Sequence, residues 1–148
     1  MAEHAGVDYA VLRQARLLSL MSIDELRALD SRLVDLQLHT HRHRVPDNRE
    51  LFLREIADNR TVLERAGRLD RNLVHFCYPS GEHRPSVLPW LEETGILSAT
   101  TCDPGLASAD SNPLLLPRFI DTERTTDAEF NGWLSGFRGL LNRRALGF

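Results

Sequence analysis

Three histidines gather within five positions of this chain, in the segment Leu-Gln-Leu-His-Thr-His-Arg-His-Arg over residues 36–44. Neutral imidazole is a common protein ligand for borderline metals such as zinc. His39 and His43 are four residues apart, so a helical turn would bring both rings to one face, where they could share one ion. His41 would point away from that pair. The spacing therefore predicts a metal site at His39 and His43, which still needs a third protein ligand from elsewhere.

A second group of residues that could do chemistry is the turn Tyr78-Pro79-Ser80-Gly81, which follows an apolar run. Proline and glycine commonly end strands in this way, so the turn could be purely structural. A turn at this place can also aim backbone N–H groups, such as that of Ser80, at a developing oxyanion. Both interpretations stay open at this point.

Arg118 follows Pro117 at the end of another apolar run. A guanidinium there can hold a carboxylate through two parallel hydrogen bonds, although surface ion pairs are the more common use of such a residue. The sequence predicts a carboxylate partner for Arg118 without naming it.

Apolar periodicity and capping signals predict the elements that must position these residues. The predicted strands cover 33–38, 73–78, 96–101 and 114–119. Helices are predicted over about 8–20, over a short stretch that begins at Ser22, over a long stretch from Asp47 to Gly67, over 87–94, and from Asp127 to about Arg144. Ser22 and Glu25 form the capping box of the second helix, and Asp47 with Glu50 caps the third. Such alternation predicts an α/β fold with a mostly parallel sheet or barrel, with its ligand site at the carboxyl ends of the strands.

Composition narrows the class of protein. A length of 148 residues, with 42% hydrophobic and 26% charged residues, fits one domain over residues 1–148. A net charge of −3 gives no basis for binding nucleic acid or an anionic membrane through broad electrostatic attraction. No run approaches the ~20 apolar residues of a membrane span, and the start lacks a signal peptide, so we expect a cytoplasmic protein. Cys77 and Cys102 are expected to be reduced and buried.

His39-Thr40-His41-Arg42-His43 resembles the H-[ST]-x-x-H zinc motif of the polysaccharide deacetylases of the NodB-type carbohydrate esterase family. Phe76 to Gly81 looks like the second conserved turn of that family, and Leu116 to Phe119 resembles a late strand. The resemblance covers roughly residues 20–135. It implies a partial or distorted (β/α) barrel, zinc or another divalent metal as cofactor, and hydrolytic removal of N- or O-acetyl groups from a polysaccharide or glycan precursor.

By this resemblance His39 and His43 are metal ligands, and Thr40 supports the loop between them. Ser80 stands where the family places a backbone N–H for the oxyanion, within the substrate turn 78–81. Arg118 is similar to the arginine that orients the catalytic aspartate.

Two departures from the family pattern shape the expectations. No T-F-D-D-G motif precedes His39, and no L-x-H motif follows His83. The catalytic base, the general acid and the third ligand therefore stay unnamed, unless Asp8, Asp24 or Asp35 stands in. We expect a chain that begins inside the domain, with its first strands missing, an open sheet edge and little or no activity.

Two alternatives to an active deacetylase remain. One is a non-catalytic, degenerate deacetylase fold that binds metal or a glycan. The other is a metal-dependent phosphoesterase or amidohydrolase, because Asp35 with the histidines is also similar to the D-x-H-x-H entrance of those families.

Overall fold

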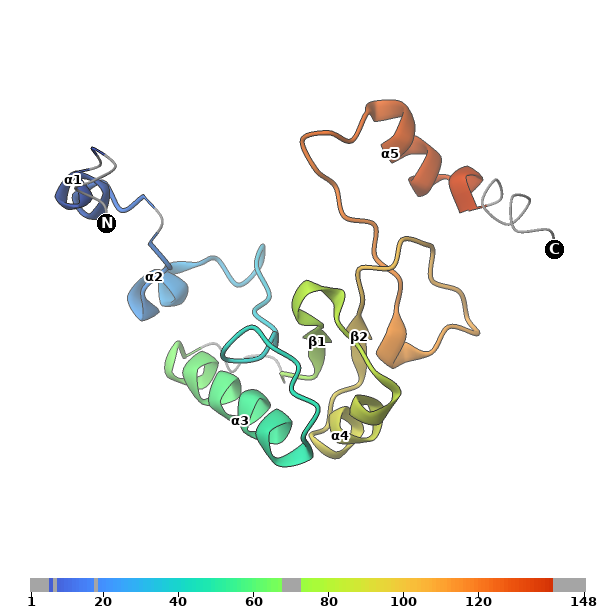
Figure 1. Ribbon diagram of the computed structural model, residues 1–148, viewed down its shortest axis with the longest axis horizontal. Coiled ribbons are helices and arrows are strands. Elements are labelled where there is room, and N and C mark those ends of the chain that lie inside the picture. Colours follow the sequence, from blue (N-terminus) through green and yellow to red (C-terminus); the bar gives the residue numbers. More distant parts are fainter. Residues whose placement is uncertain (1–5, 7, 18, 68–72, 140–148) are drawn as a thin grey trace.

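The computed structural model describes residues 6, 8–17, 19–67 and 73–139. In chain order its helices, strands and 3-10 turns are α1 (Tyr9–Gln14), α2 (Ile23–Ala28), α3 (Arg49–Arg65), β1 (His75–Cys77), η2 (Pro79–Gly81), η3 (Pro85–Val87), α4 (Leu88–Glu93), β2 (Ser98–Thr100), η4 (Pro113–Leu115) and α5 (Asp127–Leu134). Figure 1 shows α3, α4 and the strands gathered in one region, from which α1 and α2 extend on one side and α5 on the other.

The centre of the fold is a parallel sheet. Strand β1 pairs with β2 in parallel, with Phe76 opposite Ala99. Leu38 forms an isolated parallel bridge with Phe76, and Leu116 forms one with Thr100. Four segments therefore lie side by side in chain order, and their carboxyl ends meet at one edge, as predicted for an α/β fold. Among the described residues this sheet stays open and does not close into a barrel.

All four predicted strands are longer than the observed pairing, and two of them are reduced to a single bridge. The predicted strand 33–38 contributes only the bridge at Leu38, because the amide groups of Leu33 and Val34 turn back to the Asp30 carbonyl at 3.0 and 2.9 Å. Leu33 is 83% exposed, and within this segment only Leu38 is buried, with Leu36 partly buried against the core. The predicted strand 114–119 likewise contributes one bridge, at Leu116, because residues 113–115 form the turn η4.

The core lies between the sheet and the helices α3 and α4. Phe52 on α3 is fully buried, and its ring lies 6.2 Å from that of Phe76 and 5.8 Å from that of Trp90. The buried apolar residues that form this cluster are Leu38, Val45, Phe52, Ile56, Leu63, Leu73, Phe76, Tyr78, Val87, Leu91, Ile96, Ala99 and Leu114. All of them come from residues 38–114, so the sheet, α3 and α4 form one packed unit.

The long helix α3 begins one residue later than predicted. Asn48 is its N-cap, and its side-chain oxygen accepts a hydrogen bond from the Leu51 amide at 3.0 Å. The prediction of Asp47 as the cap is wrong, because its carboxylate instead accepts a hydrogen bond from the Ser86 hydroxyl at 3.3 Å. The predicted end of the helix at Gly67 is confirmed by the left-handed backbone there, with φ of 69°.

The N-terminal arm, made of α1 and α2, and the C-terminal arm, made of α5, contribute no buried residue. The predicted helix over 8–20 stops at Gln14, since Arg16 is left-handed with φ of 55°. The predicted capping box of Ser22 and Glu25 is confirmed. The predicted closing helix ends at Leu134, before the left-handed Gly136, and residues 140–144 of that prediction lie outside the described residues.

None of the helices in the described part of the chain combines the length and the apolar character that crossing a membrane requires.

Candidate functional site

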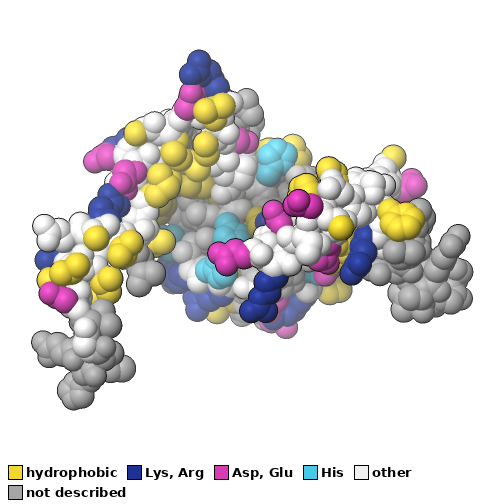
Figure 2. Space-filling model, turned by 90° about the horizontal axis from the view of Figure 1, so that it is seen from above, with side chains coloured by type: hydrophobic (Ala, Val, Ile, Leu, Met, Phe, Trp, Pro, Cys, Tyr) yellow, Lys and Arg dark blue, Asp and Glu magenta, His cyan; other side chains and the backbone are white. Residues whose placement is uncertain are grey.

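The histidine segment leaves the sheet at Leu38 and forms a tight loop rather than the predicted helical turn. Thr40 and His43 have left-handed backbones, with φ of 63° and 53°. These two reversals still bring the rings of His39 and His43 together, edge to face, with their centroids 4.9 Å apart. His41 is exposed. Figure 2 looks onto the carboxyl edge of the sheet, where histidine side chains lie in a hollowed part of the surface.

The ring of His39 is fixed by a backbone carbonyl. Its Nδ1 lies 2.6 Å from the carbonyl oxygen of Cys77, on the neighbouring strand β1. A carbonyl can only accept a hydrogen bond, so Nδ1 carries the proton and the neutral ring keeps its lone pair on Nε2. This is the arrangement by which proteins orient a metal-binding histidine. The His39 amide also donates to the side-chain oxygen of Asn59 on α3 at 2.9 Å.

Glu55 of α3 holds the rest of the loop. Its side chain is 1% exposed and accepts hydrogen bonds from the Arg42 amide at 2.8 Å, from the Arg42 guanidinium at 3.1 Å and from the Arg44 Nε at 2.9 Å. Burial raises the pKa of the Glu55 carboxyl, but the bonds from Arg44 and Arg42 outweigh it and leave the pKa below its ordinary value. The buried carboxylate is therefore charged and neutralised by the loop itself.

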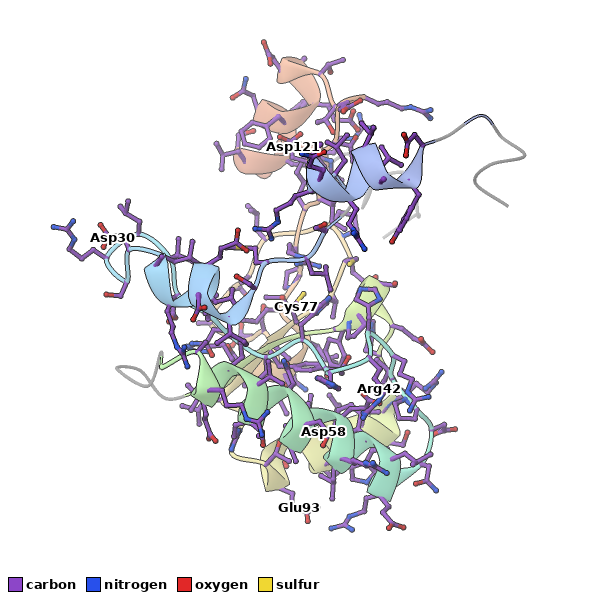
Figure 3. All side chains as sticks on the ribbon, turned by 90° about the vertical axis from the view of Figure 1, so that its left-hand side faces the viewer. Asp30, Arg42, Asp58, Cys77, Glu93 and Asp121 are labelled. Atoms are coloured by element: carbon purple, nitrogen blue, oxygen red, sulfur yellow. The ribbon has the colours of Figure 1, made fainter. Side chains whose placement is uncertain are left out.

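Asp58, one turn along α3, pairs with the same arginine from the surface. Its carboxylate accepts from the Arg42 guanidinium at 2.7 Å, and this bond is the main reason why the pKa of Asp58 is lowered. Figure 3 shows Arg42 and Asp58 on the α3 side of the molecule, with Cys77 nearer its middle.

The turn 78–81 begins directly after the carbonyl that holds His39. Ser80 and Gly81 are both left-handed, with φ of 55° and 71°. A Cβ on Gly81 would lie 2.5 Å from the Cβ of Cys102 and 2.9 Å from its amide nitrogen, so glycine is required there. The Ser80 amide takes part in no hydrogen bond among the described residues. The structure thus places this turn beside His39, with one backbone donor available.

Tyr78 anchors the base of that turn in the core. Its hydroxyl donates to the Leu114 carbonyl at 3.0 Å, and burial raises the pKa of the phenol to about 12. Its ring is fully buried, so the residue supports the turn rather than facing a substrate.

Arg118 lies at the carboxyl end of the fourth segment, but its contacts differ from those predicted. Its Nε donates to the Thr101 carbonyl at 3.1 Å, and its guanidinium lies 3.1 Å from the Cys102 sulfur. The contact with Cys102 is the main reason why the pKa of Arg118 is raised. In the part of the chain that the structure describes, Arg118 forms no ion pair with a carboxylate. Cys77 and Cys102 are free and partly buried.

The donors around His39 and His43 fit a metal ion in part. Two imidazoles lie close together, and one has its second nitrogen held by a carbonyl, as in metal sites of proteins. Among the described residues, no three side chains of histidine, cysteine, aspartate or glutamate lie close enough to hold one ion together. The described chain thus offers two of the protein ligands that a zinc site needs.

Sequence reasoning missed Glu55 and Asn59. A signal for both was present, because they follow Phe52 by three and seven residues and so share its inward-facing stripe on α3. A charged and an amide side chain on an apolar stripe need buried partners. The loop rich in arginine and histidine just before the helix is the nearest source of such partners.

Comparison with known proteins supports the fold. No family model matches the chain, and no curated protein matches it either. Among solved structures, the chain is similar to the Streptococcus pyogenes deacetylase PplD in complex with acetate, with a TM-score of 0.64 and 21% identity over 84% of this chain and 54% of that one. It is also similar to IcaB from Ammonifex degensii, with a TM-score of 0.62 and 20% identity over 78% of this chain and 51% of that one.

The chain spans about half the length of these two structures. TM-scores of 0.62–0.64 establish a shared fold, and identities of only 20–21% leave activity to be argued from the site. Over the covered residues, the chain therefore has part of the fold of a deacetylase, with an open parallel sheet at its centre.

Proposed function

We propose that this chain is a polysaccharide deacetylase-type hydrolase domain that uses a divalent metal, zinc in the first instance, to remove N- or O-acetyl groups from a glycan or glycan precursor. The observation that carries the proposal is the pair His39 and His43 at the carboxyl edge of the sheet, with Nε2 of His39 left free by the bond to Cys77. A fold shared with a deacetylase solved with acetate supports the choice of reaction.

His39 and His43 would hold the ion at the carboxyl edge of the sheet. A bound zinc would supply a Lewis acid that polarises the acyl oxygen. The Ser80 amide, which has no acceptor among the described residues, would donate to the same oxygen as negative charge develops on it. The rigid turn keeps this donor in place, because Gly81 packs directly against Cys102 and Tyr78 is anchored in the core.

A hydrolase of this kind also needs a carboxylate base and an acid for the leaving group, each typically worth about 10²–10⁴-fold in rate. Arg118 contacts Cys102 and the Thr101 carbonyl instead of a carboxylate in the described chain. We therefore expect the 148-residue chain to bind zinc but to turn over an acetylated chito-oligosaccharide slowly or not at all.

Zinc titration by calorimetry tests the metal site. The protein should bind one zinc ion per chain, and His39→Ala and His43→Ala should each abolish binding while circular dichroism stays unchanged. His75→Ala is the matched control, since His75 is exposed on β1 and contacts Ser98 at 2.8 Å. Absence of zinc binding in the wild type, or equal binding in the His39 variant, would refute the proposal.

The second candidate is a non-catalytic fold that binds a metal or a glycan. It is favoured by the observation that His39 and His43 have no third metal ligand beside them among the described residues. Turnover separates the two. Robust hydrolysis that is lost on chelation and restored by zinc would exclude the binding fold. Zinc binding without turnover is expected of this chain under either hypothesis, and the two then differ in a longer version that adds an aspartate pair, which should turn over substrate only if the domain is of the deacetylase type. The phosphoesterase alternative loses support because Asp35 is exposed and accepts from the Gln37 side chain at 3.0 Å, instead of facing the histidines.

A further inference from the structure

We infer that Glu55 is a positioning residue for the His39 and His43 pair, acting through Arg42 and Arg44 without touching the metal. This inference rests on the proposed metal site, since it concerns what sets the geometry of its two ligands. It assigns a site-organising role to a buried charge on α3.

The loop between the two histidines depends on two residues with an unfavourable backbone conformation. Left-handed backbones at Thr40 and His43 are unfavourable for residues that carry a Cβ, so the surrounding structure must fix them. Thr40 contributes locally, because its hydroxyl accepts a hydrogen bond from the Arg44 amide at 3.2 Å. One such bond closes the loop but does not tie it to the rest of the molecule.

Glu55 provides that tie. One carboxylate oxygen accepts the Arg42 amide at 2.8 Å, which fixes the backbone immediately before His43. The other oxygen accepts the guanidinium groups of Arg42 and Arg44 at 3.1 and 2.9 Å. The carboxylate thus contacts the residue on each side of His43, and it does so from a position that is 1% exposed.

The other end of the pair is anchored separately. His39 donates its amide to Asn59 and its Nδ1 proton to the Cys77 carbonyl. Glu55 and Asn59 are four residues apart on α3, so one face of a single rigid helix holds both ends of the loop. The distance between the two imidazoles therefore depends on α3 at both ends of the loop and on β1 through the Cys77 carbonyl, and removing Glu55 affects the His43 end.

Asp58 provides a matched control. It pairs with the same Arg42 guanidinium at 2.7 Å but is more exposed, and in the described structure it accepts no hydrogen bond from the loop backbone. Removing its charge removes a bond to Arg42 without freeing the amide before His43. If Glu55 only balanced the charge of Arg42, removing the charge of Glu55 or of Asp58 would change the zinc affinity by a similar amount. If Glu55 positions the loop, its removal should weaken zinc binding much more than the removal of the Asp58 charge.

The experiment measures zinc affinity by competition with a chromogenic chelator for the wild type, Glu55→Gln, Glu55→Ala and Asp58→Asn. Substitutions behind a metal ligand typically weaken binding by about 10–100-fold. We expect a loss in that range for Glu55→Ala, about tenfold for Glu55→Gln, which keeps one acceptor oxygen, and less than about twofold for Asp58→Asn. Zinc affinities of both Glu55 variants within twofold of the wild type would overturn the inference.

A second measurement is independent of the metal. In the metal-free protein, amide exchange at Arg42 should accelerate and the ring-to-ring contact between His39 and His43 should weaken in Glu55→Gln but not in Asp58→Asn, as read by nuclear magnetic resonance. If the wild type binds no zinc, the proposed function fails and this measurement alone decides the role of Glu55. Unchanged exchange and ring contact in a folded Glu55→Gln protein would then refute it.

Discussion

The packed unit, residues 38–67 and 73–116, and the two arms are built in different ways. In the packed unit, apolar side chains from α3, α4 and the strands share one core, and both ends of the histidine loop are held by contacts to residues far along the chain. In the arms, α1, α2 and α5 bury no residue and are defined mainly by local caps at Asp8, Ser22 and Thr126. Figure 1 shows this contrast as a dense centre with extended ends.

This difference indicates that the packed unit, and not the arms, determines the geometry of the candidate site. Helices α1 and α2 have six residues each, well below the ~12–15 at which isolated helices become marginally stable in water. Neither contributes to the histidine loop or to the turn 78–81. Changes in the packed unit should therefore alter global stability and the site together, whereas changes in the arms should alter neither.

The largest effect is expected from Phe52→Ala. The Phe52 ring is fully buried between those of Phe76 and Trp90, and removing such a side chain typically costs about 3–5 kcal/mol of unfolding free energy. The matched change in an arm is Leu134→Ala, where the side chain is 66% exposed and the expected cost is under about 0.5 kcal/mol. Chemical denaturation measures both losses of unfolding free energy. Similar losses for the two variants would contradict the distinction between the packed unit and the arms.

Gly81→Ala should have the next largest effect. A Cβ there meets Cys102 at 2.5 Å, and the backbone is left-handed, so overpacking and strain together cost roughly 2–4 kcal/mol. Gly95→Ala is the control, because Gly95 is also left-handed but its Cβ would meet nothing within 4 Å, which leaves a cost of about 1 kcal/mol. Equal destabilisation of the two variants in thermal unfolding would show that the contact with Cys102 is not limiting.

Much of the packed unit was predictable from sequence because its signals are local and agree with one another. The parallel direction of the four segments follows from the alternation of strands and helices, and the ends of α3 at Gly67 and of α4 before Gly95 follow from glycine punctuation. The chemistry-bearing residues also fell where strand ends predict them. His39 and the turn 78–81 share one edge of the sheet.

What sequence could not supply were contacts that depend on tertiary geometry. The Cys77 carbonyl on His39 and the Glu55 carboxylate on Arg42 join residues 38 and 13 positions apart, and no spacing rule encodes such pairs. Strand length was overestimated at Leu33, because alternation in sequence does not reveal whether a neighbour covers the apolar side. Among the described residues Arg118 contacts the sulfur of Cys102, a partner that its position alone could not indicate.

Tyr78→Phe should cost about 1 kcal/mol, because it removes the bond to the Leu114 carbonyl and leaves that carbonyl unpaired. Burial raises the pKa of Tyr78 to about 12, against about 10 in an unfolded chain. The stability that depends on the neutral phenol is therefore complete below pH 10 and is lost as the pH rises toward 12. Denaturation measured across this range should show a steeper decline for the wild type than for Tyr78→Phe. Tyr9→Phe, in an arm and largely exposed, should reproduce the wild-type decline.

The smallest effect is expected from removing a helix cap in an arm, and it gives the sharpest test of the comparison. Ser22 caps α2 by accepting a hydrogen bond from the Glu25 amide, and Asn48 caps α3 by accepting one from the Leu51 amide. The two caps are of the same kind, but α2 lies in an arm and α3 in the packed unit. Loss of a cap typically costs about 1 kcal/mol of helix stability. In α3 that cost should appear in global unfolding, because the helix carries Phe52 and Ile56 into the core.

In α2 the same loss should stay local. Ser22→Ala should speed amide exchange within α2 and leave the denaturation midpoint unchanged, whereas Asn48→Ala should lower that midpoint and also weaken zinc binding, since α3 carries the anchors of the histidine loop. A midpoint shift of equal size in both variants would mean that α2 is coupled to the core through contacts beyond its cap, and the arm would then have to be counted as part of the packed unit.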